Sequence, residues 1–200
     1  MTKNTFLTVA LALVTTFGGI GTPMADSKSV EGSPASESLL GTLRGRERIF
    51  FGSVVGAPGG AMLDSRCGDS EWISALNIAA TGTFVDGLGV QCIDKPMLGF
   101  ATNLPVVGPG AASALPFGCP TPGAVPTGIY GRAGSVVDRI GLVCRGYRDA
   151  LDRGELGGDW GGPGGSTFIN ECPRGYWLVG LRIWSGLYIS AVQPICRYDP

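Results

Sequence analysis

The sequence predicts an all-β fold built from three similar units. Glycine and proline, the residues that most disfavour long helices, account for 34 and 14 of the 200 residues, which argues against an all-α bundle. Apolar and polar residues alternate with a period of two in several segments, as they do in strands. The six cysteines recur at intervals of about 52 residues, which indicates an internal repeat.

The first 25 residues have the features of a secretory signal peptide. Lys3 supplies a positive start, an apolar run covers residues 6–14, and small residues lead to Ala25. The run is shorter than the roughly 20 apolar residues that a membrane-spanning helix needs. Residues 26–46, rich in Ser, Glu and Arg, are expected to be a flexible leader. We therefore expect a secreted, extracellular protein with one domain over residues 47–200.

The domain contains three copies of one unit, at about residues 47–96, 97–146 and 147–200. The opening cysteines are spaced by 52 and 53 residues and the closing cysteines by 52 and 52: Cys67, Cys119 and Cys172, then Cys92, Cys144 and Cys196. Glycines keep the same register, eleven residues before each opening cysteine and ten before each closing one: Gly56, Gly108, Gly161, Gly82, Gly134 and Gly186. Independent series that share one period establish the repeat.

Each copy has a β pattern. Asp86, Leu88, Val90 and Cys92 occupy alternate positions in the first copy, and the second copy has the same pattern over residues 138–144. The third copy has Pro194 in the equivalent strand, which predicts an edge strand or a bulge. A unit of this length accommodates about four strands, so a threefold β-prism and a β-trefoil are the architectures that fit.

The six cysteines are expected to form disulfides. The sequence has no histidine and no CxxC pair, so a zinc site is disfavoured, and we expect neither a metal nor a cofactor. Fifteen pairings are possible in principle. The repeat selects one of them by symmetry: Cys67–Cys92, Cys119–Cys144 and Cys172–Cys196.

Small-residue clusters and glycine-initiated turns suggest a family. Each copy carries one cluster before its opening cysteine: Pro58-Gly59-Gly60, Gly110-Ala111-Ala112 and Pro163-Gly164-Gly165. Two copies then carry a GxxxD turn, at residues 82–86 and 134–138. This combination resembles jacalin-type lectins, and its cysteine-bearing form resembles vitelline membrane outer layer proteins. The resemblance implies a type I β-prism of three four-stranded Greek-key sheets with internal pseudo-threefold symmetry.

The resemblance also implies sugar sites at the GxxxD turns: Gly82, Thr83, Phe84 and Asp86, and Gly134, Ser135, Val136 and Asp138. In such a site the turn offers backbone N–H groups and the carboxylate accepts hydrogen bonds from sugar hydroxyls. A glycine of a nearby cluster, such as Gly59, Gly60, Gly164 or Gly165, would let the ligand approach the backbone. The third copy has Ser190 in place of the aspartate, so no standard site is expected there.

Aromatic side chains near the turns could lie against the apolar face of a sugar ring: Phe84, Trp184 and Tyr188. The structural alternative for each aspartate is that its carboxylate accepts only from local backbone N–H groups and stabilises the turn. The glycine clusters have the same alternative, because glycine is the usual residue of tight turns.

Composition narrows the function classes. The absence of histidine excludes Ser-His-Asp and Cys-His catalysis, and a net charge of −1 offers no field for nucleic acid. A secreted, non-catalytic carbohydrate-binding protein with glycans or glycoconjugates as partners fits best. The alternatives are a structural coat or matrix protein without a discrete ligand, and a carboxylate-based glycoside-active enzyme. Exposed sheet edges would allow a homodimer.

Residues 147–160 have no counterpart in the other copies by sequence. This segment holds several acidic residues: Asp149, Asp152, Glu155 and Asp159. Two of these carboxylates would suffice for a glycosidase of suitable geometry. We instead expect the segment to be a solvated connection between the second and third copies.

Overall fold

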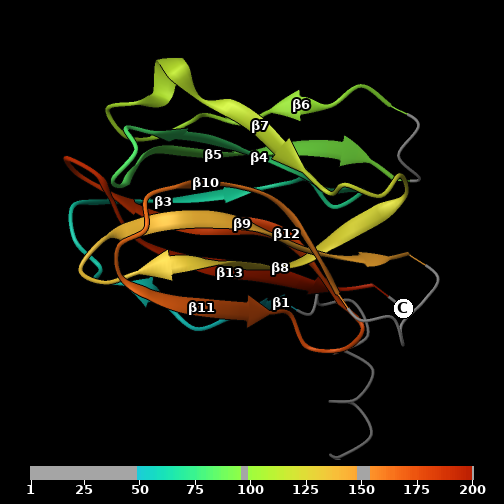
Figure 1. Ribbon diagram of the computed structural model, residues 1–200. Coiled ribbons are helices and arrows are strands. Elements are labelled where there is room, and N and C mark those ends of the chain that lie inside the picture. The colour runs from blue at the N-terminus through green and yellow to red at the C-terminus, as the bar shows by residue number, and fades with distance from the viewer. Residues whose placement is uncertain (1–48, 96–98, 148–153, 200) are drawn as a thin grey trace, which may run out of the picture. The chain divides into compact units, whose positions relative to one another are not determined.

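The computed structural model describes residues 49–95, 99–147 and 154–199 (Figure 1). The predicted signal peptide and leader lie outside the described residues. Within these ranges thirteen strands form three antiparallel sheets, and the single helical element is the 3-10 turn η2 (Ala111–Ser113). This part of the chain is therefore all-β, as predicted.

Each sheet is built on one long hairpin flanked by shorter strands. Sheet A has the order β1-β13-β12-β3, with β2 also paired to β13: β1 (Ile49–Phe51), β2 (Val55–Gly56), β3 (Ala61–Arg66), β12 (Tyr176–Ser185) and β13 (Ile189–Tyr198). Sheet B has the order β6-β5-β4-β7: β4 (Glu71–Ala80), β5 (Val85–Asp94), β6 (Thr102–Asn103) and β7 (Leu115–Gly118). Sheet C has the order β10-β9-β8-β11: β8 (Ala124–Ala133), β9 (Val137–Gly146), β10 (Glu155–Gly161) and β11 (Ser166–Glu171).

The three sheets share one core. Alternate residues of each hairpin point inward and are fully buried, as the period of two predicts: Leu76, Ile78, Leu88 and Val90 from sheet B, Ile129, Ile140 and Leu142 from sheet C, and Leu181, Ile183 and Val192 from sheet A. Burying a side chain of this size contributes about 1.5–3 kcal/mol relative to leaving it exposed. Three hairpins around a common core form the predicted β-prism.

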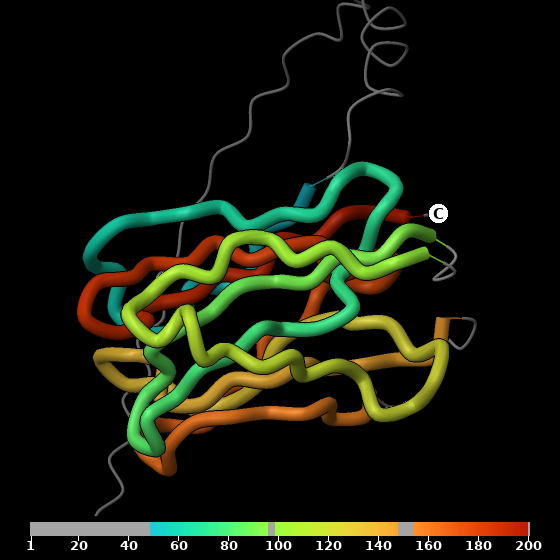
Figure 2. The backbone as a smooth tube through the Cα atoms, turned by 90° about the horizontal axis from the view of Figure 1, so that it is seen from above, coloured from blue at the N-terminus to red at the C-terminus, as the bar shows by residue number. Residues whose placement is uncertain are grey.

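The sheets are offset from the sequence repeat by half a copy. Sheet B, for example, takes β4 and β5 from the first copy and β6 and β7 from the second. Sheet A closes the ring by joining the N-terminal strands β1–β3 to the C-terminal hairpin β12–β13, as Figure 2 shows where the blue and red ends of the described chain run side by side.

The predicted disulfide pairing is confirmed, with Cys67–Cys92, Cys119–Cys144 and Cys172–Cys196 bonded. Because the sheets are offset from the copies, each bond within a copy connects two different sheets. The bonds connect sheets A and B, B and C, and C and A in turn. Together they link the three sheets into a covalent ring.

Of the two positions predicted for the strand with Pro194, the edge is wrong, because β13 is a central strand of sheet A. On one side β13 pairs with two short strands, β1 and β2, which are separated by a gap. In this gap Gly52 N donates to Pro194 O at 2.9 Å, and Gln193 Nε2 donates to Gly52 O at 2.8 Å. The Gln193 amide thus takes over the hydrogen bond to Gly52 that proline cannot donate.

The segment 147–160 is not merely a solvated connection with no counterpart. Its described part includes β10, which pairs with β9 as β6 pairs with β5 in sheet B. A bulge between Leu156 and Asp159 breaks the alternation that would have indicated a strand. β10 is equivalent to β6 by its position in the sheet, although the two segments do not resemble each other in sequence.

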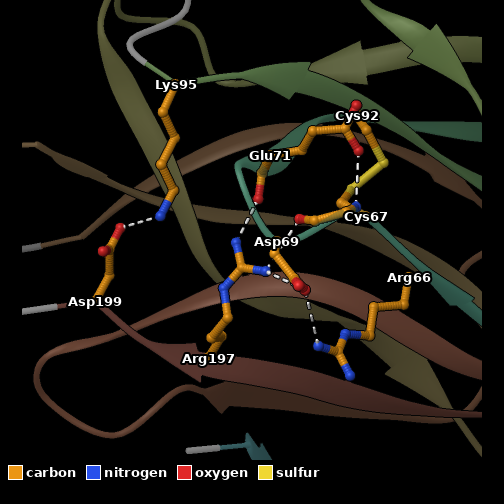
Figure 3. A network of polar contacts seen from close by, with 9 residues as sticks. Arg66, Cys67, Asp69, Glu71, Cys92, Lys95, Arg197 and Asp199 are labelled. Carbon is orange, nitrogen blue, oxygen red and sulfur yellow. Dashed lines mark hydrogen bonds and ion pairs between the residues drawn. A yellow bond between two sulfur atoms is a disulfide. The ribbon is translucent and has the colours of Figure 1, made fainter. Parts of the chain in front are cut away.

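The hairpins run between two ends, which we name by their contents. The turn end holds the three hairpin turns, at residues 81–84, 134–136 and 186–188 (Figure 1, left). The cysteine end holds the three disulfides and the polar contacts of Figure 3. There Arg197 of sheet A donates to the carbonyl oxygens of Gly68 and Glu71, at 3.0 and 2.7 Å, and Lys95 pairs with Asp199.

Candidate functional site

At the turn end, each hairpin contacts a glycine-rich segment from the following copy. Three equivalent backbone bonds fix these contacts: Gly110 N to Asp86 O at 2.9 Å, Gly162 N to Asp138 O at 2.8 Å, and Ala57 N to Ser190 O at 3.1 Å. The glycines that allow them have positive φ angles and lie so close that a side chain would collide with the hairpin backbone: Gly108, Gly161 and Gly56. The threefold repeat therefore produces three equivalent candidate sites.

The three candidate sites combine different residues. Sheet B places Asp86 against Gly110-Ala111-Ala112, and sheet A places Ser190 against Pro58-Gly59-Gly60. Sheet C places Asp138 against Pro163-Gly164-Gly165. Among the three, sheet C alone brings an aspartate and a glycine pair together. We call this arrangement the sheet C site.

In the sheet C site the carboxylate lies directly against the glycine pair. A side chain at Gly164 or Gly165 would collide with the Asp138 carboxylate, and Gly165 has a φ of 58°. Arg132 holds the pair from the other side, because its Nε and Nη2 donate to the carbonyl oxygens of Gly164 and Gly165, both at 2.7 Å. The side chain of Asp138 is therefore positioned before any ligand arrives.

The predicted turn residues of this site lie beside Asp138. Gly134 N donates to Val136 O at 2.9 Å, which closes the turn. Gly134 and Ser135 are exposed, Val136 is half-buried, and Asp138 itself is only 4% exposed. The site thus has an exposed rim of backbone and a recessed acceptor.

The equivalent site of sheet B has one glycine beside its aspartate instead of two. Asp86 is 8% exposed, and its Oδ1 atom has no hydrogen-bond partner among the described residues. The turn η2 follows Gly110 directly and is fastened to it, since Ser113 donates to Gly110 O from both N and Oγ, at 2.9 and 3.0 Å. Gly82 and Thr83 of this turn are exposed, and Phe84 is half-buried.

The equivalent site of sheet A has no acid and uses its hydroxyl internally. Ser190 Oγ donates to Gly59 O at 2.6 Å. Tyr188 packs on Phe84 of the neighbouring sheet B turn, with ring centroids 5.0 Å apart. Phe84 and Tyr188 therefore contact each other instead of lining separate sites, and half-buried Trp184 lies at the end of β12.

The acidic residues considered for a glycosidase are engaged elsewhere or lie outside the described residues. Glu155 accepts from Thr121 Oγ1 at 2.7 Å, and Asp159 pairs with Arg139 at 3.6 Å. Asp149 and Asp152 fall in the gap at residues 148–153. In the described ranges, His, Cys, Asp and Glu side chains nowhere gather in a group that could hold a metal ion, and no helix there is long and apolar enough to cross a bilayer.

Comparison with known proteins gives a curated relative of low sequence identity. No protein-family model matches the chain. A mannose/glucose-specific lectin from Parkia platycephala is 28% identical over 125 residues, which is 61% of this chain and 26% of that protein. The chain thus corresponds to about a quarter of the length of this relative.

Solved lectin structures have the same fold. Single-chain recombinant jacalin has a TM-score of 0.55 at 15% identity, over 78% of this chain and 99% of that one. The Calsepa lectin in complex with a biantennary N-glycan has a TM-score of 0.56 at 19% identity, over 77% and 98%. The Calystegia sepium agglutinin has a TM-score of 0.54 at 20% identity, over 76% and 97%. The chain therefore has the type I β-prism fold of jacalin-type lectins, as predicted, and the β-trefoil is excluded.

Proposed function

We propose that this protein is a non-catalytic lectin that binds glycans through the sheet C site. The observation that carries the proposal is the contact of the Asp138 carboxylate with the glycine pair Gly164-Gly165. Sequence resemblance assigned equal weight to Asp86 and Asp138, and the glycine pair beside Asp138 is our reason for preferring it. Gly82 and Thr83, and Gly134 and Ser135, form the exposed rims of the two candidate sites.

The chemistry of the sheet C site suits a sugar. A carboxylate accepts hydrogen bonds from two vicinal hydroxyls, and charge-assisted bonds of this kind are about twice as strong as neutral ones. The absence of side chains at Gly164 and Gly165 lets the Asp138 carboxylate lie against the backbone of the pair, so that a ring bound to the carboxylate would also lie near that backbone. The names of the Parkia platycephala relative and of the Calsepa complex refer to mannose, glucose and an N-glycan, which makes neutral hexoses the first ligands to test.

The proposal also includes that the protein is exported and that it does not cleave its ligand. Three disulfides suit an oxidising, extracellular compartment, where we place the protein and its glycan partners. The described acids of the segment 147–160 are bound to Thr121 and Arg139, which supports binding without bond cleavage. A homodimer through exposed sheet edges stays a prediction.

A glycan array tests the proposed function with two matched variants. Asp138→Asn keeps the shape of the side chain and removes its charge, and we expect binding to weaken at least about tenfold because a hydrogen bond to a charged group contributes about 1.5–3 kcal/mol. Asp86→Asn is the control, since it makes the same change in the site that lacks a glycine pair and should leave binding within about twofold.

Circular dichroism establishes that both variants fold. Equal losses in the two variants would assign binding to both sites and contradict the preference for sheet C. A folded wild-type protein that binds no glycan would favour the structural coat role instead. Release of reducing ends from polysaccharides would favour the glycoside-active enzyme.

A further inference from the structure

The outer face of sheet B carries a polar hollow that the proposed function does not use. It has a volume of about 310 Å³ and is bordered by three amide side chains, Asn77, Gln91 and Asn103. This volume lies at the lower end of the range typical of small-molecule sites. We call it the amide hollow.

The crossover from β6 to β7 creates the hollow. This segment runs across the outer side of sheet B and includes η2 (Figure 1, top). It lies directly on Gly87 and Gly89 of β5, where a side chain would meet Gly110, Ala111 and Val106 at about 3 Å. The next residue of β5 on this face is Gln91, which borders the hollow.

The three amides form one connected network. Asn77 Nδ2 and Gln91 Nε2 both donate to Asn103 Oδ1, at 3.0 and 3.1 Å, and Ser74 Oγ donates to Gln91 Oε1 at 3.1 Å. Hydrogen bonding in such a network fixes the side-chain orientations before a ligand binds. No described residue accepts a hydrogen bond from the Asn103 amide nitrogen or donates one to Asn77 Oδ1. Among the described residues, the amides that border the hollow therefore keep one donor and one acceptor for a ligand.

The other two sheets fill the equivalent positions differently. Strand register places Tyr130, Val143 and Leu156 there on sheet C, and Arg182, Ile195 and Phe51 on sheet A. Tyr130 donates to Gly157 O at 2.9 Å, and the Arg182 guanidinium lies over the Phe51 ring and binds Asp64. The repeat alone therefore does not require amides at these positions, and sheet B differs from its two counterparts.

We propose that the amide hollow is a second binding site, for one neutral sugar unit. Its lining includes no charged side chain, which disfavours an anionic ligand. The free donor and acceptor match a pair of vicinal hydroxyls, each of which both donates and accepts. The walls of Val106, Ala111, Ala114 and Pro116 suit the C–H face of a pyranose ring. The inference rests on the proposed function in that it assumes a glycan ligand, and it adds a site away from the turns.

Nuclear magnetic resonance tests the amide hollow directly. The ¹⁵N-labelled protein is titrated with the methyl glycosides of mannose, glucose, galactose and N-acetylglucosamine, one at a time. We expect saturable shifts in the side-chain NH₂ signals of Asn77, Gln91 and Asn103 with at least one of these sugars. The same shifts should appear in Asp138→Asn, because that variant changes only the turn end.

Two variants and a control test whether the shifts of the NH₂ signals report binding in the amide hollow. Asn103→Leu introduces the residue that sheet C has at this position and should weaken the affinity at least about fivefold, and Ala114→Leu should do the same by filling the space. Leu156→Ala changes the equivalent exposed position of sheet C and should have no effect. Unchanged affinity in both hollow variants would overturn the proposal.

The outcomes separate this proposal from the proposed function. Shifts confined to the turn end, or hollow shifts that disappear in Asp138→Asn, contradict the second site and leave the lectin function intact. Hollow shifts without turn-end shifts support the second site and contradict binding at the sheet C site. No shifts at either place contradict both.

Discussion

The two ends of the prism use the same threefold repeat for different purposes. At the cysteine end all three copies keep the cysteine pair, and the three disulfides connect the sheets in a ring. At the turn end the backbone contacts are equally threefold, but the side chains differ: Asp86, Asp138 and Ser190. Cross-links and backbone contacts are needed in every copy to hold the sheets together, whereas a binding site is needed only once. We infer that the cysteine end carries stability and the turn end carries binding.

Removal of one disulfide is the strongest test of this comparison. The double variant Cys172→Ala/Cys196→Ala opens the link between sheets C and A, and we expect the free energy of unfolding to fall by about 3 kcal/mol in the chain-entropy description. Chemical denaturation under non-reducing conditions measures the loss. Glycan affinity, measured where the variant is folded, should stay within about twofold. A stable variant with abolished binding would show that the ends are not independent.

Loss of Arg197 should have the next largest effect, again on stability alone. Arg197 is 4% exposed and donates to the carbonyl oxygens of Gly68 and Glu71, so Arg197→Met should cost about 2 kcal/mol by removing two hydrogen bonds from a buried, charged donor. Arg66→Met is the control, because the partner of Arg66 at 3.7 Å, Asp69, has an 89% exposed side chain, and loss of such a pair should cost less than about 0.5 kcal/mol. Equal losses of stability in the two variants would show that the burial of Arg197 does not determine the cost of removing it.

Gly165→Ala should affect both properties, with binding more sensitive than stability. Gly165 has a φ of 58°, and an added methyl would collide with both the Ala133 backbone and the Asp138 carboxylate, so alanine displaces that acceptor and costs at least about 1–2 kcal/mol of stability. Isothermal titration with the best glycan should show no measurable binding. Gly123→Ala is the control, since Gly123 also has a positive φ, of 81°, and an added methyl there would meet no described atom within 4 Å. Retained binding in Gly165→Ala would contradict the sheet C site.

The smallest effect on stability is expected for an ion pair on sheet A, between the two ends of the prism. The hydrogen bond from Arg182 lowers the pKa of Asp64 below its ordinary value. The pair therefore stabilises the protein above the unfolded-state pKa of about 4, and this contribution disappears as the pH falls through the folded-state pKa. Because both groups are partly exposed, Asp64→Asn should cost less than about 0.5 kcal/mol at neutral pH. Urea denaturation at neutral and acidic pH checks this, and a cost that persists in acid would contradict it.

The sequence determined every feature that depends on local pattern or on the repeat. Period-two alternation identified the buried face of β5 and β9, and the 52-residue period identified the disulfide partners. It also identified the turns that carry Asp86 and Asp138. These features were readable because each of them recurs in register, so that one copy confirms another.

Only the tertiary structure decided which copies meet. Strand pairing offsets each sheet by half a copy, so disulfides within a copy connect different sheets and each turn contacts the glycine cluster of the following copy. That pairing places Asp138, and not Asp86, against a glycine pair, and it makes a central strand of β13 despite Pro194. The physical reason is that hydrogen bonds between strands are made with distant segments, and a sequence pattern with threefold symmetry is the same whichever neighbouring copy supplies the partner.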